Sequence, residues 1–253
     1  MPRWAAFAGF VGVVLGGLLL LARASADALD SSTAEFPATL SDRVVDAPVA
    51  AERPPRRGDT PSTSALLVNV VVSQGAFASL LVVGAWLAAI PAAAFGLSAA
   101  AFAPRSLAAG VALGVGLHVV NAVGQRLSDR LGLGDSTTLR RAMTPESAAG
   151  WAVLLLVVLP LVAGFEELLF RGVLVGVLAA GFDVSPWLLA ALSSIAFALG
   201  HGAQGRAGVV VTGLLGFVLA VAFLLTGSLA TVVIAHYLVN ALEFVVNERY
   251  RSD

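Results

Sequence analysis

Cysteine is absent from the 253 residues of this chain, which excludes thiol catalysis, disulfide bonds and thiolate metal sites. Lysine is absent as well, because all 15 basic residues are arginine, so a lysine nucleophile or Schiff base is excluded. Charge of either sign is scarce: 12% of the residues are charged and the formal net charge is -1. No basic face is available to neutralise phosphates, and no nucleic-acid partner is expected.

Apolar residues, by contrast, make up 58% of the chain, and the mean hydropathy of +0.90 is far above that of soluble domains. Apolar runs of about 20 residues, the length that crosses a bilayer as a helix, recur along the sequence. They predict an all-α, polytopic transmembrane bundle of about seven helices, at residues 4–21, 65–95, 106–123, 148–180, 187–201, 207–225 and 229–246.

The chain divides into three regions by composition. Residues 1–22 are either an N-terminal transmembrane helix or a secretory signal, since the small residues Ala-Ser-Ala follow the apolar run. Residues 23–64 hold seven acidic residues, five arginines and the stretch ERPPRRGDTP, which predicts a disordered polar linker. Residues 65–253 are expected to form the membrane-embedded domain, with its motif core at 148–247.

The arginines predict an orientation in the cell (plasma) membrane. An external N-terminus places twelve arginines on the cytoplasmic side, whereas the opposite arrangement leaves only Arg3 and Arg105 there. The positive-inside rule therefore favours the first arrangement. A cleaved signal would contradict it, because the linker would then be exported.

Three polar islands interrupt the apolar second half: EELLFR at 166–171, FALGH at 197–201 and HYLVN at 236–240. Ionisable groups in a membrane span cost several kcal/mol unless they are paired or used, so a functional site is the default interpretation. Glu166 and His201 lie 17 and 18 residues from the centre of the short 181–186 connection, which predicts a similar depth. The 226–228 turn should return His236 to within roughly 7 to 13 Å of that depth.

The run at 148–180 is too long to span upright, because it would measure roughly 50 Å as a helix. We expect it either to tilt and project or to break at Pro160.

Spacing within the islands indicates which side chains act together. Glu167 and Arg171, four residues apart, share a helix face and can form an ion pair, while Glu166 points about 100° away. His236 and Asn240 present an imidazole and an amide on one face. A carboxylate and an imidazole that activate water, with an oxyanion held by a second imidazole and an amide, would suit hydrolysis.

Each island also has a structural interpretation. The ion pair could serve only to join helices, and the His236 and Asn240 pair could hydrogen-bond between helices. His201 could be a helix-end residue that meets water, and Phe197 could be core packing.

In this order the three motifs resemble the CPBP family of intramembrane proteases, which includes the type II CAAX prenyl endopeptidases and the bacteriocin-processing or Abi proteins. The resemblance covers about residues 148–247, and all three motifs are intact. It implies that Glu166 is the general base and that His201 shares the nucleophilic water. It further implies that His236 and Asn240 stabilise the oxyanion. The matching supporting positions are Glu167, Arg171 and Phe197.

The resemblance leaves the metal question open, because the family has been described both as metalloproteases and as metal-free, glutamate-dependent enzymes. Zinc could in principle bind Glu166, His201 and His236, although there is no HExxH motif. We favour chemistry without a metal.

Three further polar residues on the predicted helices, outside these motifs, also require an interpretation. His118 and Asn121 share a face of the third predicted helix, and we favour an interhelical hydrogen bond over a catalytic role for them. Glu243, seven residues after His236, either lines the cavity or marks the exit of the last helix to water.

We therefore expect an intramembrane endopeptidase that opens towards the cytoplasm, with membrane lipid and a protein or peptide substrate, prenylated or not, as its partners. One alternative is a catalytically silent scaffold or maturation factor of the same family. A proton-coupled transporter ranks lower, because Glu and His chains relay protons but no inverted repeat is visible.

Overall fold

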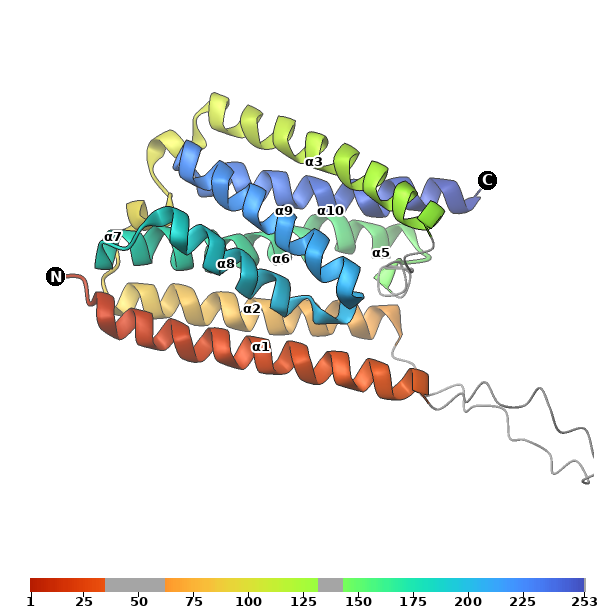
Figure 1. Ribbon diagram of the computed structural model, residues 1–253, viewed down its shortest axis with the longest axis horizontal. Coiled ribbons are helices and arrows are strands. Elements are labelled where there is room, and N and C mark those ends of the chain that lie inside the picture. Colours follow the sequence, from red (N-terminus) through yellow and green to blue (C-terminus); the bar gives the residue numbers. More distant parts are fainter. Residues whose placement is uncertain (35–61, 132–142, 253) are drawn as a thin grey trace, which may run out of the picture.

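The computed structural model describes residues 1–34, 62–131 and 143–252. Within these ranges the regular structure is entirely helical and forms seven rods that lie side by side along one long direction (Figure 1). Six of the described helices are long and apolar enough to cross a membrane, and Pro186–Gly200 is a shorter apolar helix. The predicted all-α, polytopic bundle is confirmed.

The rods follow one another along the chain with short turns between most of them. The fourth rod joins α-helical and π-helical stretches, and 3₁₀ turns precede α3 and α9. The helices are α1 Trp4–Ala34, α2 Thr63–Leu87, α3 Pro104–Leu131, α5 Ala148–Val153, α6 Leu159–Glu167, α7 Leu178–Phe182, α8 Pro186–Gly200, α9 Gly205–Thr226 and α10 Leu229–Ser252. The π-helical stretches are Leu154–Val158 and Leu168–Val177, and the 3₁₀ turns are Ala92–Phe95, Ala99–Phe102 and Gly202–Gln204.

Helix α1 packs into the bundle and runs further than its apolar core predicts. Phe7 and Val11 are buried in a cluster with residues of α2, α6 and α8, and the Trp4 ring lies so close to Gly181 that a Cβ there would approach it within 2.8 Å. The helix continues to Ala34, into the predicted linker, because its alanine-rich sequence favours helix. Residues 35–61 of that linker lie outside the described residues.

Helix α2 ends at Leu87 instead of near residue 95. Pro91 lacks a backbone N–H and disfavours helix in the residue before it, and Ala89 adopts φ 53. The carbonyls at the helix end are taken up by Arg3, whose backbone N–H donates to Ala88 at 2.8 Å and whose guanidinium donates to Leu87.

The long fourth rod does not break at Pro160. Residues 148–182 form one continuous helical stretch, and the π-helical turn at 154–158 directly precedes the proline. A π turn shifts the hydrogen-bond register by one residue, so the missing N–H of Pro160 is accommodated without a break. Of the two alternatives, the structure supports the unbroken helix.

Two tight turns then fold the C-terminal half back on itself. Asp183, with φ 53, ends α7 before Pro186 starts α8, and Gly227, with φ 61, joins α9 to α10. Both turns fall where they are predicted. Helix α10 lies against α3 so closely that a Cβ on Gly114 would approach the Ala235 carbonyl oxygen within 2.8 Å.

Candidate active site

Both glutamates of the EELLFR motif lie at the end of α6, where the helix changes to π-helical geometry. π turns are rare and occur frequently at functional sites, because they reorient the side chains beside them. Glu167 is completely buried, whereas the side chain of Glu166 remains 12% exposed. The two neighbouring carboxylates therefore occupy different environments, as their spacing predicts.

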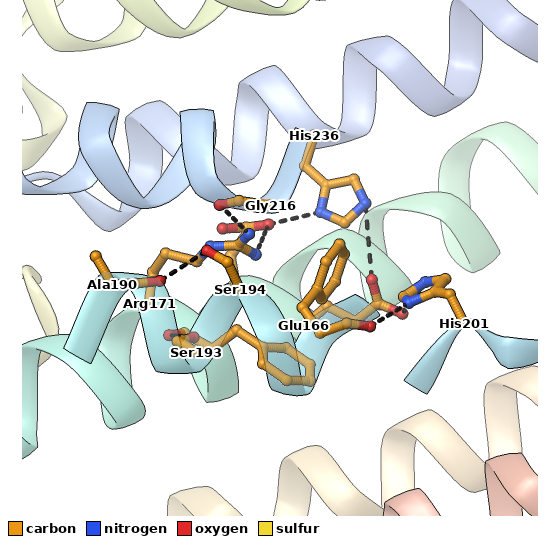
Figure 2. A network of polar contacts seen from close by, with 11 residues as sticks. Glu166, Arg171, Ala190, Ser193, Ser194, His201, Gly216 and His236 are labelled. Atoms are coloured by element: carbon orange, nitrogen blue, oxygen red, sulfur yellow. Dashed lines mark hydrogen bonds and ion pairs between the residues drawn. The ribbon is translucent and has the colours of Figure 1, made fainter. Parts of the chain in front are cut away.

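Glu166 lies between two imidazoles (Figure 2). Its Oε1 is 4.0 Å from His201 Nε2, and its Oε2 is 3.7 Å from His236 Nε2. His201 is located at the end of α8, and His236 lies on α10. The prediction that three distant islands meet in one layer is confirmed.

Both imidazoles are oriented through Nδ1. His201 Nδ1 lies 2.8 Å from the carbonyl oxygen of Phe197, and His236 Nδ1 lies 2.6 Å from Glu167 Oε1. A carbonyl and an ionised carboxylate can only accept hydrogen bonds, so each Nδ1 carries the proton and donates it. Each ring consequently directs Nε2 towards Glu166, which fixes its tautomer when it is neutral.

Arg171 pairs with Glu167, as the spacing predicts. Its Nη1 donates to Glu167 Oε1 at 2.7 Å, and both side chains are buried. Its Nη2 donates to the backbone carbonyl of Gly216 on α9 at 2.8 Å, and the guanidinium stacks over the Phe197 ring at 4.7 Å. The buried charge of Arg171 is thus held by a carboxylate, a carbonyl and an aromatic face.

Phe197 is the centre of an aromatic group that includes both site imidazoles. Its ring lies 4.5 Å from the His201 ring and 6.0 Å from the His236 ring, centroid to centroid, and it meets Phe170 edge-on at 5.0 Å. It therefore supports the orientation of the polar residues as well as packing the core.

Two supporting residues were not identified from the sequence. Gly216 lets α9 approach closely, since a Cβ at this position would lie 2.9 Å from the Phe197 ring. Ser193 donates to the carbonyl oxygen of Phe170 at 2.5 Å and ties α8 to the π-helical stretch. Backbone carbonyl partners leave no residue pattern, so no sequence signal could have found these contacts.

Asn240 lies one helical turn beyond His236 on α10 and is half-buried. Its side chain makes no hydrogen bond to another described residue. The structure brings Glu166, His201 and His236 into direct proximity, and it places Asn240 one turn further along α10.

The pair outside the motifs makes the predicted interhelical contact. Asn121 Nδ2 donates to Glu243 Oε1 at 2.6 Å, and His118 Nδ1 lies 3.6 Å from the same oxygen. Glu243 is buried, so its carboxylate faces α3 instead of projecting from the helix.

Glu166, His201 and His236 have the donor types of a zinc site, but their geometry does not fit one. Zinc at about 2.1 Å from each ligand would bring the ligand atoms to about 3.4 Å from one another in a tetrahedron. The observed separations are 4.0 and 3.7 Å, and the described residues contain no group of three or more His, Asp or Glu side chains arranged to hold a metal. We derive no catalytic step from a metal.

Three buried polar atoms of the site have no hydrogen-bond partner among the described residues: Glu166 Oε2, Glu167 Oε2 and Arg171 Nε. Of these, only Glu166 Oε2 belongs to a side chain that is partly exposed. Glu166 Oε2 is buried and has no hydrogen-bond partner among the described residues, which is rare in folded proteins and is associated with catalytic or water-binding positions. An ionised oxygen in this position can accept a proton from a molecule that enters the space between it and the two Nε2 atoms.

Comparison with known proteins supports the same region of the chain. Residues 148–242 match the family described as type II CAAX prenyl endopeptidase Rce1-like. No curated protein and no solved structure gives a significant match. The matched residues 148–242 carry every side chain of the predicted site, and this match confirms the resemblance to the CPBP family over that part of the chain.

Proposed function

We propose that this protein is an intramembrane endopeptidase that uses Glu166 to activate water. The observation that carries the proposal is the position of the Glu166 carboxylate between the Nε2 atoms of His201 and His236, inside a membrane bundle. The match of residues 148–242 to the Rce1-like family supports a peptidase in general terms.

The first step is proton transfer from water. Two hydrogen bonds of about 2.8 Å can bridge the 4.0 Å between Glu166 Oε1 and His201 Nε2 through one water molecule. That water gives a proton to Glu166 while its oxygen attacks the scissile carbonyl carbon. His201, neutral with its proton on Nδ1, accepts the second hydrogen bond and orients the attack.

His236 and Asn240 stabilise the oxyanion in this proposal. Because Nδ1 of His236 already donates to Glu167, its Nε2 can donate to an oxyanion only when the ring is an imidazolium. The local charge count favours that form: Glu166 and Glu167 contribute two negative charges, and Arg171 contributes one positive charge. A protonated His236 makes the enclosed group neutral.

Collapse of the tetrahedral intermediate completes the reaction. The C–N bond breaks, and the leaving amine takes the proton that Glu166 accepted from water, either directly or through His201. Glu166 returns to the carboxylate form, so one carboxyl group serves first as a base and then as an acid.

The proposed substrate is a membrane-associated or lipidated protein or peptide. The Rce1-like family name refers to CAAX prenyl endopeptidases, which suggests a chain that ends in a prenylated CAAX sequence as one class. We further propose an orientation with the C-terminal end of α10 and the α8–α9 turn in the cytoplasm of a plasma-membrane protein, in agreement with the arginine distribution.

The test compares membrane proteomes of cells that carry the wild-type protein, Glu166→Gln or Glu146→Gln. Glu146 is an exposed glutamate outside the bundle and serves as the matched control. Uncleaved substrate should accumulate only with Glu166→Gln, since loss of a general base lowers the rate about 100- to 10,000-fold. Purified protein is assayed in parallel with a quenched fluorescent peptide that carries a farnesylated CAAX sequence.

Equal cleavage by Glu166→Gln and wild type would overturn the proposal. If the cellular phenotype is unchanged while Glu166→Gln is produced normally, the protein acts as a scaffold instead of a protease.

A further inference from the structure

The chain has three histidines, and His118 is the one that is not part of the candidate active site. His118 on α3, together with Asn121, contacts the carboxylate of Glu243 on α10. A carboxylate and an imidazole inside membrane spans call for an explanation, because such groups are rare there unless they face an interior polar path or a functional site.

The position of Glu243 on α10 relates it to the site. His236, Asn240 and Glu243 are spaced i, i+4 and i+7, so they follow one face of the helix. Successive steps are about 6 Å and about 4.5 Å along the axis. The apolar span of α10 ends at Val246, one turn beyond Glu243, so a polar side chain occurs at each turn between the site and the end of the span.

Helix α3 supplies the opposite wall of this path. It runs beside α10, with Gly114 packed on Ala235 and with Asn121 bonded to Glu243. Its neighbouring residues Val119 and Val120 are 54% and 69% exposed, which marks the opposite, lipid-facing side of the helix. The polar residues of α3 therefore face inward, where they meet α10.

Hydrolysis consumes one water molecule in each turnover, and that water must reach a carboxylate whose side chain is only 12% exposed. We propose that His118, Asn121, Asn240 and Glu243, here called the α3–α10 seam, form the hydrated route by which water reaches Glu166 from the aqueous phase. This inference rests on the proposed hydrolytic function. Glu243 is a positioning residue in it: its carboxylate holds water in the seam and does not touch the substrate.

An interhelical lock does not by itself require a carboxylate at position 243. An amide or hydroxyl in place of Glu243 would accept the hydrogen bond of Asn121 without placing an ionisable group in the span. A carboxylate binds water more strongly than an amide or a hydroxyl does. Inside a membrane span, its charge is less costly where water can reach it.

The test uses the natural absence of cysteine, which makes every introduced thiol unique. Asn121→Cys and His118→Cys are compared with Val120→Cys and Val119→Cys, their immediate neighbours on the lipid-facing side. Sealed vesicles of each orientation are treated with a charged, membrane-impermeant methanethiosulfonate. The reagent reacts with thiolates, which form in water and not in hydrocarbon.

We expect the seam thiols to react from one side of the vesicle at least about tenfold faster than their neighbours. This readout requires no substrate and no activity, so it remains decisive even if the proposed reaction is wrong. Equal rates within both pairs, or no reaction of either seam thiol, would overturn the hydrated route. Variants are accepted only if they elute as the wild type does in gel filtration. The comparison can be made if both members of at least one seam–neighbour pair meet this criterion.

A second arm measures turnover of the farnesylated peptide by Glu243→Leu, Glu243→Gln and Asn121→Leu. Glu243→Leu should lower kcat about tenfold at unchanged KM, while Glu243→Gln should retain most activity because its amide still binds water. A purely structural lock predicts instead that Glu243→Leu and Asn121→Leu lower the unfolding temperature alike and leave kcat of the folded protein unchanged.

Glu166→Gln in the same assay separates the two proposals. If Glu166→Gln is inactive and Glu243→Leu turns over at the wild-type rate, the seam is wrong and the protease proposal stands. If Glu166→Gln is active, the protease proposal fails, and the thiol accessibilities alone decide whether the seam is hydrated.

Discussion

The Glu167 carboxylate holds the His236 imidazole through a 2.6 Å hydrogen bond between residues that are 69 positions apart in the chain. The same carboxylate oxygen accepts the guanidinium of Arg171 at 2.7 Å. Glu167 therefore orients a proposed oxyanion-binding group and balances a buried charge at once. Its neighbour Glu166 is left to face the two Nε2 atoms, where we propose that water reacts.

Removal of Glu167 should harm the fold more than removal of the whole pair. Glu167→Ala leaves the buried Arg171 without its counter-charge, and we expect a loss of about 3–5 kcal/mol in unfolding free energy. The double variant Glu167→Leu/Arg171→Met should be closer to the wild type in stability, because no unpaired charge remains. Thermal unfolding in detergent measures both. A double variant that is less stable than Glu167→Ala would contradict this account of the pair.

Glu167→Gln should separate positioning from stability. The amide keeps the size of the side chain, and its oxygen can still accept hydrogen bonds, but the negative charge that favours an imidazolium at His236 is removed. We expect kcat for the peptide probe to fall by more than tenfold, about 1.4 kcal/mol, with KM unchanged. A rise in KM with unchanged kcat would show that Glu167 acts on substrate binding instead.

The contact between α3 and α10 depends on the absence of a side chain at Gly114. Gly114→Ala should destabilise the bundle by about 1–3 kcal/mol, because its Cβ would meet the Ala235 carbonyl oxygen at 2.8 Å. Gly116→Ala on the same helix has open space around its Cβ and should be neutral or stabilising by up to about 1 kcal/mol. Equal effects of the two substitutions on thermal unfolding would exclude the close packing.

Gly216→Ala should act on the site through Phe197. The added Cβ would lie 2.9 Å from the Phe197 ring and 3.2 Å from Arg171 Nη2. We expect the unfolding free energy to fall by about 1–3 kcal/mol, with a matching loss of activity. The control is Gly164→Ala, two residues before Glu166, where nothing lies within 4 Å of an added Cβ. It should retain the wild-type stability and the wild-type activity.

Metal chelation should leave turnover unchanged, because the separations around Glu166 are wider than a zinc ion requires. The measurement is the cleavage rate of the peptide probe before and after dialysis against a chelator, together with the metal content of the purified protein. A loss of activity that is restored by zinc alone would contradict the metal-free mechanism.

Helix arithmetic predicted the meeting of the islands because the two turns at 181–186 and 226–228 are short. A hairpin with a short turn fixes the relative depth of residues on its two arms, and the Glu166 to His201 contact follows from that constraint. Ion-pair spacing likewise predicted the contact between Glu167 and Arg171, because it lies within one helix.

Contacts between distant helices were less predictable. The carbonyls at the end of α2 are bonded by Arg3, 84 residues away in the chain, and the partner of His236 Nδ1 depends on how α10 is rotated against α6. The continuity of the long rod through Pro160 depends on a π turn, for which the residue types provide no clear signal. Each of these features is decided by packing and not by the local sequence.

The helices that carry the three site residues also determine how the site should behave when the protein is taken out of the membrane. Glu166 and His201 lie on the two arms of one hairpin, whereas His236 arrives on α10 after another crossing. A detergent that loosens α10 would remove His236 from the site and leave the hairpin intact. Inactivation during solubilisation should then precede the loss of helical content. Added lipids that return α10 to its packed position should restore activity without refolding of the chain.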